Sequence, residues 1–182
     1  MNQRTTVSPT GDEVKKAPPA SAAEPSDEAY MRRCLALAAE AAGQDEVPVG
    51  ALVVCRGEVV GQAANTREAS RCATHHAEIL AIEEACRAVG GWRLPDSTLY
   101  VTMEPCPMCA GAAVNARIGR VVWGTDDPKA GAFGSVVDLT ALPLNHKPRL
   151  TGGVLAEECR DLLTSYFQNK RKKEKPPSFS GQ

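Results

Sequence analysis

The sequence predicts an α/β protein whose sheet is covered by helices on both faces. Short runs of β-branched apolar residues alternate along the chain with segments in which apolar residues recur at helical spacing. The chain has 182 residues, which suits one compact domain with terminal extensions. A three-layer α/β/α domain satisfies both observations.

The first half of this domain is predicted to contain a helix, a hairpin and a second helix. After Ser26, a suitable N-cap, apolar residues recur at helical spacing until Gly43. Apolar runs at residues 51–55 and 59–63 enclose a short segment that contains Gly57, which is typical of a β-hairpin. Helical periodicity returns at residues 74–89.

The second half continues the alternation of strands and helices. Strands are expected at residues 98–103 and 120–124, with a helix that begins near Pro107 between them. A last helix has its apolar residues at offsets of three and four and then becomes basic. The apolar residues of this helix are Cys159, Leu162, Leu163, Tyr166 and Phe167, and the basic ones are Lys170, Arg171, Lys172, Lys173 and Lys175.

The two ends of the chain differ in composition from this domain. Residues 1–25 are rich in Pro, Ala, Ser, Thr and charges, so we expect a disordered extension there. A transit peptide is the alternative, but the acidic residues in this segment are unusual for that class. The predicted organisation is therefore an extension at 1–25, a domain at 26–172 and a flexible tail at 173–182.

Composition limits the functional classes. The net charge of −1 is not that of a protein that grips nucleic acid by charge alone, so any such grip must be local. Neither a membrane-length apolar stretch nor a signal-peptide pattern is present, which favours the cytoplasm. The seven cysteines are odd in number, and only Cys106 and Cys109 have metal-type spacing, which argues against a disulfide scaffold.

Cys106 and Cys109 indicate a zinc site at the start of a helix. Two residues separate them, so both sulfurs can face one ion across a first helical turn, and one imidazole would complete three protein ligands. Three ligands leave the fourth tetrahedral position for water, as in catalytic zinc sites. The helix N-terminus favours thiolates, and Pro107 at the first helical position loses no hydrogen bond.

His76, Ala77 and Glu78 stand at the start of another predicted helix. Side chains two residues apart diverge by roughly 200° in a regular helix. His76 and Glu78 therefore converge only on a group beyond the helix start, and a water on a metal held by His76 would lie within reach of both.

Each motif also has a second interpretation. Cys106 and Cys109 would suit a redox pair or two buried thiols at a helix start. His-Ala-Glu by itself is typical of a capping turn with solvated charge. His75 is a neighbouring imidazole that could replace His76 as a ligand, although only His76 has a carboxylate two residues further on.

His-Ala-Glu followed by Pro-Cys-x-x-Cys is the signature of the zinc deaminases of nucleobases. Beyond this signature the chain resembles the bacterial tRNA-specific adenosine deaminases in one register from Tyr30 to Lys172. The segments that carry the resemblance are residues 46–50, 65, 76–79, 99–102, 104–106, 108–112, 117–122, 131–132 and 134–135.

The resemblance implies a cytidine-deaminase-like fold, in which helices flank a five-stranded mixed sheet, and a homodimer. It implies that the wobble adenosine of an arginine tRNA anticodon is converted to inosine with release of ammonia. One zinc ion per chain would be held by His76, Cys106 and Cys109, with Glu78 as the proton shuttle. Zinc lowers the pKa of its water to about 7 and so supplies hydroxide at neutral pH.

The resemblance also implies how the substrate is held. Asn65 would hydrogen-bond the flipped nucleoside, Val47 and Pro48 would wall its pocket, and the backbone of Ala77 would read the base. Flanking nucleotides would be held by the loop at residues 125–135 and by the last helix, through Asp127, Lys129, Tyr166 and Phe167. Tyr166 and Phe167 would equally suit an ordinary core.

Two rival functions remain. One is a deaminase of the same fold for free guanine, cytosine or a nucleotide precursor. The other is a zinc-stabilised RNA-binding or partner module without catalysis. The loop from Gly131 to Ser135 and the basic last helix favour tRNA, and Glu78 favours catalysis because a structural zinc needs no adjacent proton shuttle.

Overall fold

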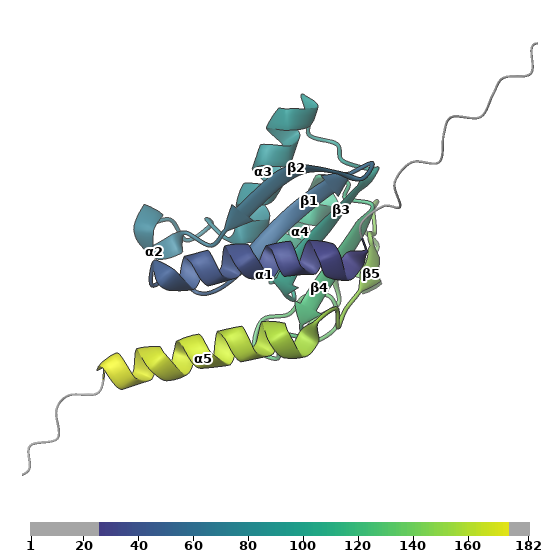
Figure 1. Ribbon diagram of the computed structural model, residues 1–182. Coiled ribbons are helices and arrows are strands. Elements are labelled where there is room, and N and C mark those ends of the chain that lie inside the picture. Colours follow the sequence, from purple (N-terminus) through teal and green to yellow (C-terminus); the bar gives the residue numbers. More distant parts are fainter. Residues whose placement is uncertain (1–25, 175–182) are drawn as a thin grey trace, which may run out of the picture.

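In the computed structural model, which describes residues 26–174, five strands form one mixed sheet in the order β2-β1-β3-β4-β5 (Figure 1). The β1 strand pairs antiparallel with β2 and β3, whereas β3, β4 and β5 run parallel. The strands are β1 (Gly50–Cys55), β2 (Glu58–Ala64), β3 (Ser97–Met103), β4 (Arg120–Thr125) and β5 (Arg149–Thr151).

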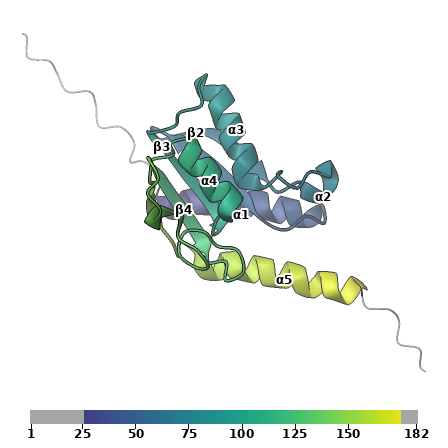
Figure 2. The same cartoon turned by 180° about the vertical axis from the view of Figure 1, so that it is seen from behind.

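Helices cover both faces of this sheet (Figures 1 and 2). One face carries α1 (Asp27–Gly43) and α5 (Ala156–Glu174), and the other carries α3 (Ala77–Val89) and α4 (Pro107–Asn115). This arrangement confirms the predicted three-layer α/β/α fold. A one-turn helix, α2 (Arg67–Ser70), and a 3-10 turn, η1 (Leu139–Ala141), lie in the connections.

The strands divide the core into two clusters because successive side chains point to opposite faces. Ala51 and Val53 of β1 join the cluster beneath α3 and α4, whereas Leu52 and Val54 join the cluster beneath α1. In β3, Tyr100 faces α1 while its two neighbours face the other layer. A strand buried on both faces is apolar throughout, which is why β1 appears in the sequence as an unbroken apolar run.

Glycines let the helices approach the sheet closely. A Cβ atom on Gly50 would lie 2.2 Å from the carbonyl oxygen of Cys34 in α1. A Cβ atom on Gly61 would lie 2.2 Å from the carbonyl oxygen of Ala81 in α3. The two layers therefore pack backbone against backbone at these points, which no larger residue allows.

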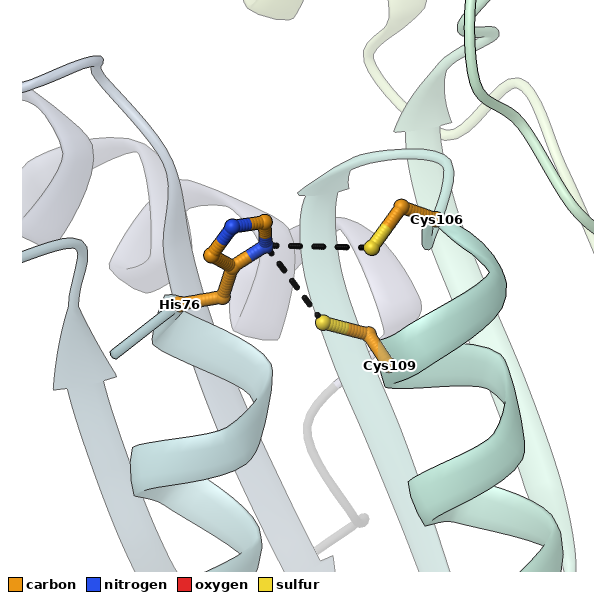
Figure 3. A group of neighbouring side chains, drawn as sticks. All are labelled: His76, Cys106 and Cys109. Atoms are coloured by element: carbon orange, nitrogen blue, oxygen red, sulfur yellow. Dashed lines mark hydrogen bonds between the residues drawn. The ribbon is translucent and has the colours of Figure 1, made fainter. Parts of the chain in front are cut away.

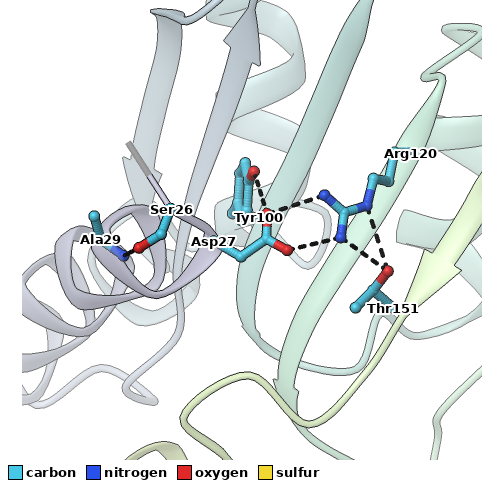
Figure 4. A network of polar contacts seen from close by, with 6 residues as sticks. All are labelled: Ser26, Asp27, Ala29, Tyr100, Arg120 and Thr151. Carbon is cyan, nitrogen blue, oxygen red and sulfur yellow. Dashed lines mark hydrogen bonds and ion pairs between the residues drawn. The ribbon is translucent and has the colours of Figure 1, made fainter. Parts of the chain in front are cut away.

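An ion pair ties the start of α1 to the parallel strands (Figure 4). Ser26 caps the helix by accepting a hydrogen bond from the Ala29 amide at 3.3 Å. Next to it, the Asp27 carboxylate accepts hydrogen bonds from both Arg120 Nη atoms at 2.9 and 2.7 Å and from the Tyr100 hydroxyl at 2.8 Å. These donors, Arg120 foremost, hold the pKa of the Asp27 carboxyl below its usual value.

The predicted elements differ from the observed ones mainly at their ends. The helix expected from residue 74 begins at Ala77 because the backbone of His76 is extended. The last helix runs to Glu174, two positions past the predicted end of the domain. The expected extension at residues 1–25 and the rest of the expected tail, residues 175–182, lie outside the described residues. Among the described residues, none of the helices is long and apolar enough to cross a membrane.

Candidate active site

The two predicted motifs meet at the N-termini of α3 and α4. His76 is the N-cap of α3 and Cys106 the N-cap of α4, and both have extended backbone angles. Neither side chain makes a capping hydrogen bond to its own helix, so both are free to turn towards each other. Pro107 occupies the first turn of α4, where its missing N–H removes no helical bond.

His76, Cys106 and Cys109 form a compact donor set (Figure 3). His76 Nδ1 lies 3.8 Å from Cys106 Sγ and 3.6 Å from Cys109 Sγ. Tetrahedral zinc with bonds of about 2.3 Å to sulfur and about 2.0 Å to nitrogen would separate such atoms by about 3.5 Å. The three side chains therefore fit a zinc ion, and among residues 26–174 His75 is not part of any such group.

The two thiols differ in acidity. Hydrogen bonds from the Cys109 thiol and from the His76 ring lower the pKa of Cys106 to about 4. The same contact with Cys106, together with burial, raises the pKa of Cys109. The shared proton is therefore held more tightly by Cys109 than by Cys106, and a metal ion bound to both sulfurs would have to displace it.

Glu78 lies beside this donor set in the first turn of α3. Glu78 is 4% exposed and lines the same cavity as His76 and Cys106. Burial raises the pKa of the Glu78 carboxyl above its usual value. A carboxyl group in such a place can hold a proton at a pH where an exposed glutamate could not, as a proton shuttle requires.

A cavity of about 110 Å³ opens in front of these residues. Glu78, His76 and Cys106 all line it, so the candidate reactive groups border a space that a base could enter. The remaining lining residues are Val47, Val49, Asn65, Arg67, Met103, Glu104 and Asp127.

The other predicted site residues are distributed around this cavity. Val47, Asn65 and Asp127 line it, whereas Pro48 and Ala77 are fully buried and do not. Lys129 and Phe167 line a second cavity of about 460 Å³, which shares Met103 and Asp127 with the first and adds Arg171. The two cavities therefore form neighbouring parts of one surface.

Tyr166 and Phe167 have different surroundings although they are adjacent in α5. Tyr166 is 8% exposed, and its hydroxyl donates to the backbone oxygen of Asp45 at 2.7 Å. Phe167 is 42% exposed. Tyr166 is therefore largely buried, as expected of a core residue, and Phe167 is the aromatic side chain of this pair that a ligand could reach.

Sequence reasoning missed two buried carboxylates, Glu46 and Glu104, which are 0% and 3% exposed. Glu46 precedes the predicted pocket wall at Val47, and Glu104 precedes the cysteine motif by two positions. The signal available in the sequence was the position of each acidic residue, which stands beside an apolar run in one case and beside a ligand motif in the other. Met103 and Arg67 were also missed, and nothing in their local sequence marks them.

Glu104 holds the loop at residues 125–135 in place. Its carboxylate accepts hydrogen bonds from the backbone amides of Phe133 at 2.9 Å, Ser135 at 3.2 Å and Asp127 at 3.2 Å, and from the Ser135 hydroxyl. A Cβ atom on Gly131 would lie 2.3 Å from Glu104 Oε2, so only glycine leaves room for the carboxylate. The loop that carries Asp127 is thereby fixed beside the cavity.

Comparison with known proteins gives consistent matches over most of the chain. The family described as MafB19-like deaminase matches residues 25–167. The tRNA-specific adenosine deaminase of Bacillus subtilis (strain 168) is 47% identical over 150 residues, which are 82% of this chain and 93% of that protein. The tRNA-specific adenosine deaminase of Haemophilus influenzae is 42% identical over 151 residues, 82% of this chain and 87% of that protein.

Solved structures show the same relationship. One matching structure comes from a study of A-to-I editing by tRNA:A34 deaminases at the wobble position of transfer RNA. Its sequence is 41% identical, the TM-score is 0.72, and the match covers 74% of this chain and 98% of the chain in that structure. A guanine deaminase from Nitrosomonas europaea is 25% identical, with a TM-score of 0.67, and covers 76% of this chain and 83% of that one.

Proposed function

Since this chain belongs to the bacterial tRNA-specific adenosine deaminases, we propose that it converts the wobble adenosine of an arginine tRNA anticodon to inosine with release of ammonia. The observation that carries the proposal is the juxtaposition of a His-Cys-Cys donor set with a buried glutamate at the wall of one cavity. A structural zinc site would not need Glu78 beside it.

In this mechanism His76, Cys106 and Cys109 hold one zinc ion per chain. When bound, zinc lowers the pKa of a water molecule and so provides the nucleophile for hydrolysis at neutral pH. Glu78 would take a proton from the attacking water and deliver it to a ring nitrogen of the base. It would then move the proton of the newly added hydroxyl group to the amino group, which leaves as ammonia. The burial of Glu78 at the cavity wall supports this role, because it keeps the carboxyl group beside the space that the base would occupy.

The chain's other residues would hold the nucleoside and its neighbours. Val47 and Asn65, which line the cavity, would contact the flipped nucleoside, whereas Pro48 and Ala77 are buried and do not line it. Lys129, Phe167 and Arg171 line the adjoining cavity, where an aromatic face and two cations suit a base and its phosphates. Anticodon loops are single-stranded, so a base can leave the stack at a lower cost than in a duplex.

The test is inosine formation on an unmodified arginine tRNA transcript with an ACG anticodon, run beside free adenosine, guanine and cytosine. We expect conversion of the wobble adenosine alone. Glu78→Gln should lower the rate by about a hundredfold to ten-thousandfold, because it removes general acid-base catalysis and keeps the shape of the site. A transcript with guanosine at the wobble position is the substrate control.

The likeness to a guanine deaminase supports one rival, a deaminase of free purine bases. Conversion of guanine with the tRNA untouched would favour that rival and leave the metal chemistry in place. A rate unchanged in Glu78→Gln would contradict the proton-shuttle mechanism for either substrate.

We further expect a homodimer that works in the cytoplasm, where its tRNA substrate is found. Several apolar side chains in the segment at residues 134–146 are well exposed, as expected of a surface that a second subunit covers. They are Val136, Val137, Leu142 and Leu144, with exposed fractions of 57%, 41%, 47% and 37%. Light scattering of the purified protein would give the mass of the assembly.

A further inference from the structure

Glu46 is a buried carboxylate that none of the steps above uses. The α1 helix ends at Gly43, and Asp45 follows with a left-handed backbone (φ 61°). The Glu46 amide then donates back to the Ala41 oxygen at 3.0 Å. This tight turn directs the Glu46 side chain inward, where it is 0% exposed.

The two oxygens of Glu46 have one donor each. Oε2 accepts from the side-chain amide of Asn65 at 3.0 Å, and Oε1 accepts from the backbone amide of Ala69 in α2 at 2.7 Å. The backbone of Asn65 is held independently, because its amide donates to the Val49 oxygen at 2.9 Å. Glu46 thus acts on the side chain of Asn65, not on the path of its backbone.

This contact decides which end of the Asn65 amide faces the cavity. An ionised carboxylate only accepts hydrogen bonds, so Asn65 must turn its NH₂ group towards Glu46. Its carbonyl oxygen, Oδ1, then points the other way. None of the described residues donates to Oδ1, and Oδ1 is not among the atoms shut off from solvent without a partner. Since Asn65 lines the cavity, this free acceptor is available to a ligand there.

We propose that Glu46 is a positioning residue for the deamination: it fixes the Asn65 amide so that Oδ1 accepts a hydrogen bond from a hydroxyl or N–H group of the nucleoside. Glu46 itself does not line the cavity and does not touch the substrate. The inference rests on the proposed function, because it assigns the role of Asn65 within that reaction.

Glu46→Gln tests the orientation with almost no change of shape. An amide cannot accept from both Asn65 and Ala69, so its oxygen keeps one donor and its NH₂ group confronts the other. The conflict is relieved if Asn65 turns over and presents NH₂ to the cavity, where the nucleoside offers a second donor. We expect kcat/KM on the tRNA transcript to fall by about tenfold to a hundredfold. Glu40→Gln, on the exposed side of α1, is the matched control and should equal the wild type.

Asn65→Asp combined with Glu46→Gln should restore the acceptor. In the double variant the new amide donates to one carboxylate oxygen at position 65, and the other oxygen faces the cavity. The charge of the pair is unchanged. Asn65→Asp alone would place two carboxylates about 3 Å apart, and its kcat/KM should be lower than that of Glu46→Gln. The double variant is therefore expected to exceed both single variants in kcat/KM.

A purely structural role of Glu46, through its contact with Ala69, predicts a different pattern. The double variant would then be no better than Glu46→Gln, because position 65 does not repair the contact with α2. That result would overturn the proposal, as would a kcat/KM for Glu46→Gln equal to that of the wild type. Tm values measured on all variants separate loss of folding from loss of orientation.

A readout without substrate separates this proposal from the proposed function. In ¹⁵N-labelled protein, the side-chain NH₂ signals of Asn65 are assigned by their disappearance in Asn65→Asp. They should exchange slowly with solvent in the wild type and faster in Glu46→Gln. Equal exchange in both proteins would overturn the orientation even if the tRNA is deaminated. Protected signals in a wild type that deaminates no tRNA would support the orientation and reject the proposed function.

Discussion

Glu104→Gln should loosen the loop at residues 125–135, because the Glu104 carboxylate accepts hydrogen bonds from three residues of this loop. Oε1 accepts from the amides of Phe133 and Ser135, and Oε2 accepts from the amide of Asp127 and the Ser135 hydroxyl. Glutamine has the same shape but offers only one acceptor. Its oxygen can keep the first two bonds, and its NH₂ group then faces the Asp127 amide.

The size of the effect follows from these contacts. The Ser135 hydroxyl can rotate and accept from the new NH₂ group, but the buried Asp127 amide cannot, and an unpaired buried donor costs about 1–3 kcal/mol. The two bonds that remain are no longer charge-assisted, which weakens each by about 1 kcal/mol. We expect a total loss of about 3–5 kcal/mol from a folding free energy that is typically about 5–15 kcal/mol.

Urea unfolding of the wild type and Glu104→Gln measures this difference directly. Ser135→Ala is the matched control, since it removes one hydroxyl from the same cluster and should cost only about 1 kcal/mol. Glu104→Gln should also raise KM for tRNA, because Asp127 and Lys129 lie on the loosened loop. A Glu104→Gln protein within about 0.5 kcal/mol of the wild type would refute the reasoning.

Three further predictions follow from other parts of the structure. Purified protein should contain about one zinc ion per chain, and Cys109→Ser should lose most of it; a full zinc content in this variant would contradict the ligand assignment. Phe167→Ala should leave the folding stability nearly unchanged, because Phe167 is 42% exposed. It should raise KM for tRNA by about fivefold to a hundredfold, because a stacking contact with a base is lost. An unchanged KM would show that Phe167 does not contact the substrate. Asp27→Asn should lower Tm at neutral pH. Since Arg120 and Tyr100 hold the Asp27 pKa below 3.8, the stabilisation is complete above pH 3.8 and is lost as the pH falls through the lowered pKa. The Tm difference between the two proteins should therefore shrink in acid, and a constant difference would show that charge is not the cause.

The motifs that form the candidate active site could be recognised in the sequence because their chemistry is local. The separation of Cys106 from Cys109 and the position of Pro107 describe one helical turn, whatever the rest of the chain does. The extended runs and helical repeats likewise determined the layers, since each reflects which faces of an element are buried. The preference for His76 over His75 as the candidate ligand also rests on a local spacing, because only His76 has a carboxylate two residues further on.

Other features depended on partners distant in the chain. The β5 strand has three residues, too few for a periodic pattern, and exists because β4 offers an open edge. Tyr166 and Phe167 are equivalent in a helical pattern, and only the backbone oxygen of Asp45 decides which one is held inside. A local rule cannot choose between adjacent apolar residues when the choice is made by packing.

The sequence by itself determined the fold class and the reactive groups, since both arise from spacings within single elements. Tertiary structure alone decided what surrounds them. Glu46 and Glu104 are buried because their donors lie 19 to 31 positions further along the chain, and the apolar run or motif beside each residue does not reveal these donors. A carboxylate can be buried only where the folded chain brings enough donors to it, and that condition exists only after the chain has folded.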